Sequence, residues 1–330
     1  MSAADNSRDR PVPTERVFLF FGYGSEYSLH DLYVYMREVG HECVEIDMLN
    51  HPDVVGALRA LEGRQVIFLT SAHLLYDDQN FFYYKTHRKV VSALHVISTL
   101  KPVASIYYPH DLKDPVKEEE LPYLPLFDLF LSPLAKLQDL EAFVPVKQVG
   151  WIKRQRSTAP VMPEDFNPPR KVFFTGAYQY YLNLGFDSFY KEYQPLFDAG
   201  IAVKLPLWHE AERFEEFLRA RGVTVYPSQA NSIHVMEENE VIFTQALSSV
   251  GIEACGVGKR VCYIKNSVLD YKDPVQELEN VGHIFFAETP EQAAAVQNDA
   301  FVPNTPSLDY FDFPGALHAI LEVAAAGAIG

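Results

Sequence analysis

The stretch EVIFTQALSSVGIEACGVGKRVCYIKN, residues 240–266, contains two apolar runs separated by a segment of small residues. The first run, residues 240–245, predicts a buried strand, and residues 248–258 predict a helix that ends at glycines. The second run, residues 259–266, predicts another strand. A strand, a helix and a strand in immediate succession indicate a βαβ unit, in which the two strands are parallel.

The same alternation extends along the chain on both sides of this stretch. Residues 151–170 interrupt it, because they are basic, rich in proline and without a period, which is typical of an interdomain connection. A single sheet of all the strands is disfavoured, because open sheets rarely exceed about ten strands. The sequence therefore predicts an α/β fold of two Rossmann-like, doubly wound domains. The further strands are expected at 16–21, 41–49, 65–70, 102–108, 127–132, 146–150, 171–176, 201–208, 223–227 and the start of 283–297. The further helices are expected at 29–40, 54–63, 80–100, the first half of 187–200, 210–222, the end of 283–297 and the end of 309–326.

These elements give the expected domain boundaries. Residues 1–15 are polar and are expected to form a disordered leader. An N-terminal Rossmann-like domain follows over 16–150, a linker over 151–170, and a C-terminal Rossmann-like domain over 171–330. The last helix is expected to pack back on the body of the protein, with the N-terminal domain as one candidate surface.

Composition excludes several classes of protein. The 330 residues carry 28 Lys+Arg and 44 Asp+Glu, a net charge of −16, which argues against nucleic-acid binding and against a polybasic membrane anchor. No apolar run approaches the roughly eighteen residues of a transmembrane helix. The 3 cysteines do not have the spacing of a zinc site or a redox-active pair. Such a sparse, odd number favours a reducing compartment, so a cytoplasmic location is expected.

The start of the helix expected within 240–266 contains candidate ligand-binding residues. Hydroxyls at Ser248 and Ser249 and the free N–H groups of a helix N-terminus suit a phosphate, and Gly251 permits close approach to the backbone. Glu253 stands one turn further on among small apolar residues, where a carboxylate needs a partner such as a pair of ribose hydroxyls. Capping and packing explain the same residues without a ligand, so both interpretations stay open.

The segment SSVGIEACGVGKRVCYI, residues 248–264, resembles the donor-site signature of GT-B glycosyltransferases. It is also similar to the CDP-glycerol and capsule-polymer transferases and to the UDP-N-acetylglucosamine 2-epimerases. The resemblance implies two domains facing across a cleft, with the nucleotide-diphosphate sugar bound by the C-terminal domain and the acceptor by the N-terminal domain. It implies neither a metal nor a resident cofactor, because the nucleotide sugar is a co-substrate.

Other residues of the second half are candidates for donor binding. Gly176 follows the first strand there, where a diphosphate could approach the backbone. His209 matches the resemblance loosely as a phosphate contact. Tyr226 and Ser228 follow the third strand, where a nucleotide base could stack and bind by its edge; this expectation rests on position alone.

The first half offers candidates for acceptor binding and proton transfer. The loop Gly22, Tyr23, Gly24 and Ser25 follows the first strand and is a candidate acceptor site, with Glu26 as a carboxylate base.

Two histidines of this half are also candidate bases. His110, with Asp111 to fix its tautomer, follows the strand at 102–108, and His73 follows the strand at 65–70.

The leading hypothesis is a glycosyltransferase of glycan or polysaccharide biosynthesis that moves a sugar to a hydroxyl of a carbohydrate, lipid-linked or protein acceptor. The alternatives are a sugar-nucleotide epimerase and a non-catalytic sugar- or nucleotide-binding protein of the same fold. The sugar, the nucleotide base and the stereochemical outcome stay open.

Overall fold

The structure is a computed structural model of the 330-residue chain. The chain forms two compact units. The first contains the described residues up to 109, those of 118–149 and those of 312–327, and the second contains Leu112 and the described residues of 150–311. The structure describes residues 16–22, 29–47, 51–71, 92–109, 112, 118–134, 140–155, 170–175, 185–206, 211–244, 249–265, 284–297, 300–301 and 308–327.

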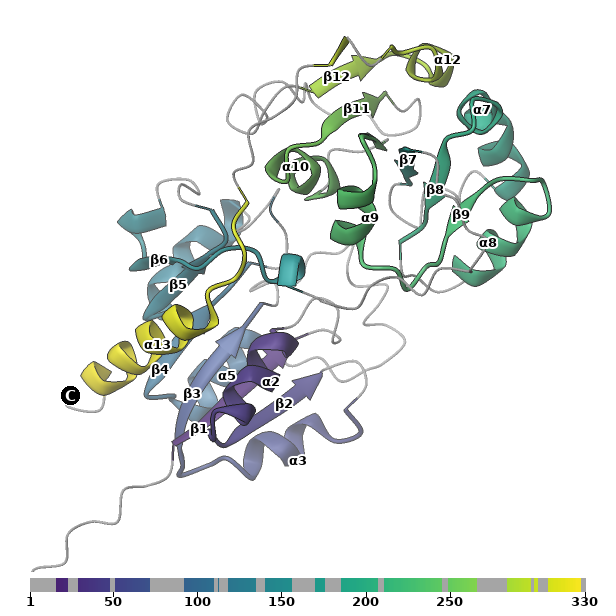
Figure 1. The fold of residues 1–330 in the computed structure, drawn as a ribbon. Coiled ribbons are helices and arrows are strands. Elements are labelled where there is room, and N and C mark those ends of the chain that lie inside the picture. The colour runs from purple at the N-terminus through teal and green to yellow at the C-terminus, as the bar shows by residue number, and fades with distance from the viewer. Residues whose placement is uncertain are drawn as a thin grey trace, which may run out of the picture. The chain divides into compact units, whose positions relative to one another are not determined.

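The first unit is built on a six-stranded parallel sheet with the strand order β2-β1-β3-β4-β5-β6 (Figure 1). Its central strands are buried along almost their whole length, as expected for a sheet covered on both faces. The elements of this unit are β1 (Arg16–Gly22), α2 (His30–Glu38), β2 (Cys43–Asp47), α3 (Val54–Arg59), β3 (Gln65–Thr70), α5 (Ala93–Leu100), β4 (Ala104–Tyr107), the 3-10 helix η1 (Glu118–Leu126), β5 (Leu129–Ser132), η2 (Leu140–Ala142), β6 (Val146–Gln148) and α13 (Phe313–Gly327).

The second unit also has a six-stranded parallel sheet, with the order β12-β11-β10-β7-β8-β9. Counted within the unit, this is the 3-2-1-4-5-6 order of the dinucleotide-binding fold. Its elements are η3 (Ile152–Gln155), β7 (Lys171–Phe174), α7 (Phe186–Asp198), β8 (Ala202–Lys204), α8 (Ala211–Arg219), β9 (Val225–Tyr226), α9 (Ser232–Glu238), β10 (Val241–Thr244), α10 (Ser249–Gly256), β11 (Arg260–Ile264), β12 (Ile284–Ala287) and α12 (Pro290–Ala294).

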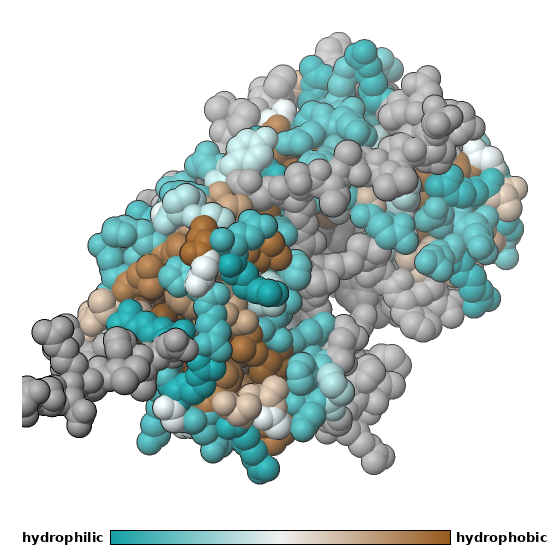
Figure 2. All heavy atoms as spheres, turned by 60° about the horizontal axis from the view of Figure 1, so that its bottom comes forward, coloured by the Kyte–Doolittle hydropathy of each residue, from teal (hydrophilic) through white to brown (hydrophobic). Residues whose placement is uncertain are grey.

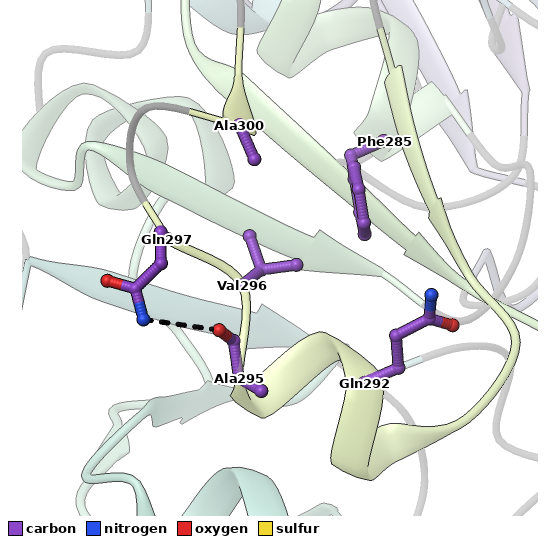
Figure 3. A pocket seen from close by; sticks show the side chains of 6 residues that line it. All are labelled: Phe285, Gln292, Ala295, Val296, Gln297 and Ala300. Carbon is purple, nitrogen blue, oxygen red and sulfur yellow. Dashed lines mark hydrogen bonds between the residues drawn. The ribbon is translucent and has the colours of Figure 1, made fainter.

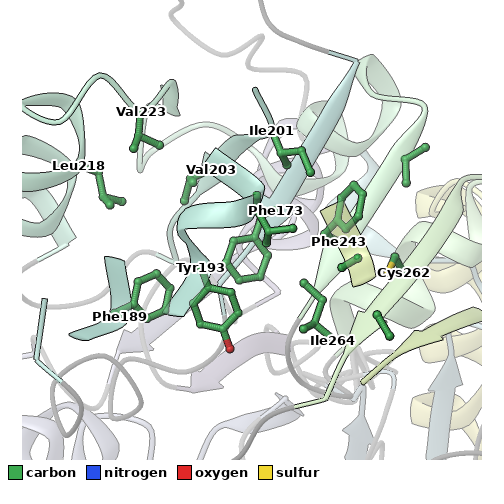
Figure 4. Packing of buried hydrophobic residues seen from close by; sticks show 14 of the residues in the cluster. Phe173, Phe189, Tyr193, Ile201, Val203, Leu218, Val223, Phe243, Cys262 and Ile264 are labelled. Carbon is green, nitrogen blue, oxygen red and sulfur yellow. The ribbon is translucent and has the colours of Figure 1, made fainter. Parts of the chain in front are cut away.

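Aromatic side chains fill the core of the second unit, between the sheet and helices α7 and α8 (Figure 4). The ring of Phe173 on β7 lies 4.9 Å from that of Tyr193 on α7, and Phe189 lies 5.2 Å edge-on from Phe214 on α8. Tilted and edge-to-face aromatic pairs of this kind add stability beyond the area they bury. The many aromatic residues of this region are therefore explained by core packing.

The chain passes from the first unit to the second after Val149 and returns after Phe311. Trp151 forms a β-bridge with Tyr310, so the outgoing and returning segments lie side by side within the second unit. The returning chain then forms α13, which packs on α2, β4 and β5 of the first unit (Figure 1). Of the expected connection 151–170, residues 151–155 belong to the second unit, and 156–169 lie outside the described residues.

Three local expectations differ from the structure. Helix α7 continues through Pro195 to Asp198, beyond the expected first half, and α9 was not expected at all. The acidic run KEEE at 117–120 is predicted from its charge to be a solvated loop, but η1 begins at Glu118 and Glu120 is fully buried. Burial in the folded protein, which the sequence pattern does not display, accompanies each of these differences: Tyr193 and Leu196 on α7, Ile233 and Met236 on α9, and Glu120 on η1 are buried.

Apolar side chains also reach the surface of the first unit. Figure 2 shows brown, hydrophobic residues gathered on one face of this unit among teal, polar ones. Exposed large apolar side chains of the unit include Val39, Val55 and Leu126.

None of the helices in the described part of the chain has both the length and the apolar content that crossing a membrane requires.

The cysteines are expected to resist alkylation in the folded protein. Burial raises the pKa of Cys255 and of Cys262 to about 12, and the pKa of the half-buried Cys43 to about 11. Because a raised pKa leaves little thiolate at pH 8, we expect iodoacetamide to label these thiols at least about tenfold more slowly in the native protein than in urea. Mass spectrometry of quenched samples measures this, and fast labelling of Cys255 or Cys262 in the native state would contradict their buried position.

Candidate functional site

The carboxyl ends of the strands in the second unit form the candidate site. Strands β7 and β10 are neighbours in the sheet, yet the chain leaves β7 toward β8 and leaves β10 toward β11 on the other side. In open α/β sheets, ligands bind in the crevice that forms where the strand order reverses in this way. Residues at the ends of β7 and β10 and at the start of α10 therefore define the site.

Helix α10 begins at this reversal point, as the sequence predicted. Ser249 is its first residue and is almost completely buried. A Cβ added to Gly251 would meet only the Thr244 methyl group, at 3.9 Å, which is an ordinary contact. Packing among the described residues therefore does not require a glycine at this position, and close approach of a ligand is a reason for one.

Thr175, directly after β7, was not a candidate from the sequence. Its side chain is 7% exposed, and its hydroxyl is a buried polar atom without a hydrogen-bond partner. Leaving a buried hydroxyl unpaired costs about 1–3 kcal/mol, so such a group in a native fold calls for an explanation. A ligand at the carboxyl end of β7 would supply the missing partner. The signal in the sequence was its position between an apolar strand and Gly176.

Lys204 at the end of β8 was also missed as a site residue. It is 2% exposed, and its Nζ donates hydrogen bonds to the backbone oxygens of Leu205, at 2.5 Å, and Ser228, at 2.8 Å. The Lys204 carbonyl oxygen accepts a hydrogen bond from the Thr175 N–H at 3.2 Å. The structure thus pairs the backbones of Lys204 and Thr175, and it buries the Lys204 ammonium against the segments that follow β8 and β9.

Glu253 lies one turn into α10 and is 2% exposed. Its Oε1 accepts a hydrogen bond from Trp151 Nε1 at 3.0 Å and lies 3.4 Å from Lys153 Nζ. The carboxylate thus has the partner that the sequence analysis required, but two protein side chains supply it. Whether it also binds a ribose stays a prediction.

Tyr226 and Ser228 have contacts within the protein. Tyr226 is fully buried, its hydroxyl accepts a hydrogen bond from Asn239 Nδ2 at 2.8 Å, and burial raises its pKa to about 12. In this conformation its ring has no free face on which a base could stack. Ser228 is buried, and its backbone oxygen accepts from Lys204, which ties the end of β9 to the end of β8.

The basic residues of the connecting segment are also paired. Lys153 faces Glu253, and Arg154 donates to the Leu308 carbonyl oxygen, lies 3.8 Å from Glu237 and stacks over the Tyr310 ring. These contacts hold the outgoing and returning segments together.

At the carboxyl edge of the first sheet, the structure describes Gly22 at the end of β1, which pairs with Asp47. The Thr70 hydroxyl at the end of β3 donates to the Phe21 carbonyl oxygen at 2.8 Å and ties the two strands together. The remaining candidates lie outside the described residues: Tyr23, Gly24, Ser25, Glu26, His73, His110, Asp111, Gly176, His209 and Ser248.

A cavity of about 480 Å³ lies elsewhere in the second unit, at β12 and α12 (Figure 3). Its lining has no charged residue and none of the candidate site residues, so we do not assign donor binding or catalysis to it. Its lining consists of Phe285, Gln292, Ala295, Val296, Gln297 and Ala300. Among the described ranges, no three His, Cys, Asp or Glu side chains gather as metal ligands.

No protein-family model and no curated protein matches the sequence. Among solved structures, a variant of the wall teichoic acid polymerase TagF has a TM-score of 0.55 at 11% identity, over 96% of this chain and 90% of that one. A Listeria monocytogenes protein assigned as a UDP-N-acetylglucosamine 2-epimerase has a TM-score of 0.46 at 12% identity, over 94% and 96% of the two chains. The glycosyltransferase SnogD from Streptomyces nogalater has a TM-score of 0.41 at 15% identity, over 96% and 95%.

The chain therefore has the two-domain α/β fold of the GT-B glycosyltransferases. This confirms the expected fold class and the resemblance. At such low identity the likeness shows the fold alone.

Proposed function

We propose that the protein is a glycosyltransferase that binds a nucleotide-diphosphate sugar at the carboxyl edge of its second sheet and transfers the sugar to an acceptor hydroxyl. The observation that carries this proposal is the unpaired, buried hydroxyl of Thr175 at the reversal of strand order. Helix α10 starts after β10, one neighbour of β7 in the sheet, and the buried Lys204 ends β8, the other neighbour. A hydroxyl, a helix N-terminus and a positive charge are groups that stabilise a bound diphosphate.

The reaction follows from these groups. The acceptor oxygen forms a bond to the anomeric carbon of the sugar while the bond from that carbon to the diphosphate oxygen breaks, and the diphosphate leaves with the electron pair. Thr175, the α10 N–H groups and Lys204 stabilise the charge that develops on the leaving group. No bound metal is required in this scheme.

A base on the first unit accepts the proton of the acceptor hydroxyl when the reaction inverts the anomeric centre. His110 with Asp111, His73 and Glu26 are the candidates, and the acceptor is proposed to bind near the loop of residues 22–25. A carbohydrate, lipid-linked or protein acceptor is consistent with the acidic chain, whose charge is −16.

The variant Thr175→Val tests the donor site. Valine keeps the shape of threonine and removes a buried hydroxyl that has no protein partner. The free energy of unfolding is therefore expected to stay within about 0.5 kcal/mol of the wild-type value or to exceed it. Nucleotide affinity should fall about tenfold, because the hydroxyl contacts the diphosphate. Calorimetric titration with UDP, CDP, GDP, ADP and dTDP, together with urea unfolding, measures both quantities.

A second threonine provides the control for this experiment. Thr70→Val removes a hydroxyl that does have a protein partner, Phe21, so it should cost about 1 kcal/mol of stability. If Thr175→Val binds every nucleotide as tightly as the wild type does, the proposed donor site is wrong.

Product analysis then distinguishes the proposed activity from the alternatives. A transferase releases nucleoside diphosphate from its donor only when an acceptor is present, apart from slow hydrolysis. Conversion of the sugar nucleotide without an acceptor would instead establish an epimerase, and binding without turnover would establish a non-catalytic protein.

A further inference from the structure

The chain that follows β9 is held from two sides. Residues 226–231, which we call the β9 turn, contain both sequence-based candidates for base binding, Tyr226 and Ser228. From the neighbouring strand, Lys204 Nζ at the end of β8 donates to the Ser228 carbonyl oxygen at 2.8 Å. From the end of α9, Asn239 Nδ2 donates to the Tyr226 hydroxyl at 2.8 Å. Both donors belong to buried residues, so the β9 turn is tied to β8 and to α9 inside the protein.

The far end of the β9 turn is fixed as well. Asn231 Oδ1 accepts from the Ile233 N–H at 2.8 Å and so caps α9, while Asn231 Nδ2 donates to the Lys153 carbonyl oxygen at 3.3 Å. Within the turn, the Ala230 N–H donates to the Pro227 carbonyl oxygen at 2.9 Å. Opening the turn toward a ligand would therefore break several hydrogen bonds at once.

These contacts leave little of the β9 turn for a ligand. Tyr226 is 0% exposed and Ser228 is 2% exposed. The structure describes the whole turn, and Gln229 is its one residue with an exposed side chain. Stacking on an aromatic ring strengthens the binding of a base about fivefold to over a hundredfold. The Tyr226 ring could supply this gain only by leaving the core and giving up its hydrogen bond to Asn239.

We infer that the β9 turn is a structural tie and not a base-binding surface, so that the donor site recognises the diphosphate and accepts nucleoside diphosphates irrespective of their base. This inference rests on the proposed function, since it concerns the ligand of the same site. The sheet order separates the two roles. Thr175 and the start of α10 follow β7 and β10, where the strand order reverses, whereas β9 is the edge strand and lies beyond β8 (Figure 1). Contacts to the diphosphate therefore do not need the β9 turn.

The experiment compares the affinities of the wild type for UDP, CDP, GDP, ADP and inorganic pyrophosphate by calorimetric titration. The four nucleotides should bind within about fivefold of one another, because no base is selected. Each nucleotide should also bind within about fivefold of pyrophosphate, because the nucleoside adds less than one stacking contact.

The variant Tyr226→Leu tests the ring directly. Leucine keeps an apolar side chain in the core and removes any surface for stacking, so the ratio of nucleotide affinity to pyrophosphate affinity should change less than about fivefold. A folding defect cancels in this ratio, because both ligands bind the same folded state. Phe214→Leu is the matched control, since it removes another fully buried ring of the same unit, on α8. Gln229→Ala removes the exposed side chain of the β9 turn and should also leave the ratio unchanged.

The outcomes separate the two proposals. If the wild type binds neither nucleotides nor pyrophosphate, the proposed function is wrong. If one nucleotide binds more than about fivefold more tightly than the others, the site reads the base, and the inference is wrong while the donor site stands. The same conclusion follows if Tyr226→Leu lowers the ratio more than about fivefold and Phe214→Leu does not, because Tyr226 would then leave the core to stack on the base.

Discussion

Replacing Gly150 by alanine is expected to destabilise the protein by about 3 kcal/mol or more. Gly150 has a φ of +82°, a conformation that costs an L-residue about 1–2 kcal/mol. In addition, a Cβ at this position would collide with the backbone carbonyl group of Tyr310. Backbone on the returning segment cannot move aside without breaking the bridge between Trp151 and Tyr310, so the steric cost adds to the conformational cost.

Gly222 provides a matched control for this prediction. It lies in the same unit with a φ of +79°, but a Cβ there would have no atom within 4 Å. Gly222→Ala should therefore cost only about 1–2 kcal/mol. Urea unfolding of both variants, followed by circular dichroism, measures the difference. Equal losses in the two variants would show that the outgoing and returning segments are not held together as the structure indicates.

Glu253→Ala is expected to cost about 3 kcal/mol of stability. Removing the carboxylate leaves the buried Trp151 N–H without an acceptor and Lys153 without its counter-ion. Removing one partner of a buried charged pair is costly, because the other partner stays desolvated. The small side chain also leaves a cavity at the buried centre of α10.

Glu253→Gln separates the hydrogen bond from the charge. Glutamine still offers an oxygen to Trp151 Nε1, so about half of the loss in the alanine variant should be recovered. Thermal unfolding and urea titration of both variants provide the measurement. An alanine variant as stable as the wild type would mean that the contacts of Glu253 contribute nothing to the fold.

Much of the fold was predictable from local pattern. Each strand found in the two sheets overlaps a segment predicted as a strand. Most of these segments are apolar, because buried parallel strands have nearly continuous apolar sequences. Elements whose pattern is weak were harder to predict. Helix α9, with the sequence SIHVMEE, is short, and its N-terminus depends on the side chain of Asn231, which accepts from the Ile233 N–H at 2.8 Å.

The candidate site was predictable only in part. The start of α10 and the carboxylate at Glu253 were identified because a strand, small residues and a helix follow one another in sequence. Thr175 and Lys204 were missed, because a threonine after a strand and a lysine within one are common and gain meaning only from burial. Tyr226, by contrast, was a candidate from its position after a strand, as a residue that could stack on a nucleotide base. In the structure its ring is buried.

The sequence by itself determined most of the secondary structure and the division into two α/β halves, because these follow from periodicities over a few residues. Only the tertiary structure decided which residues separated in the chain meet. The contact between Glu253 and Trp151 spans 102 positions, and the bridge from Trp151 to Tyr310 joins the outgoing and returning segments. Such contacts depend on the order of strands in the sheet and on the path of the returning chain, and no local pattern of residues records either.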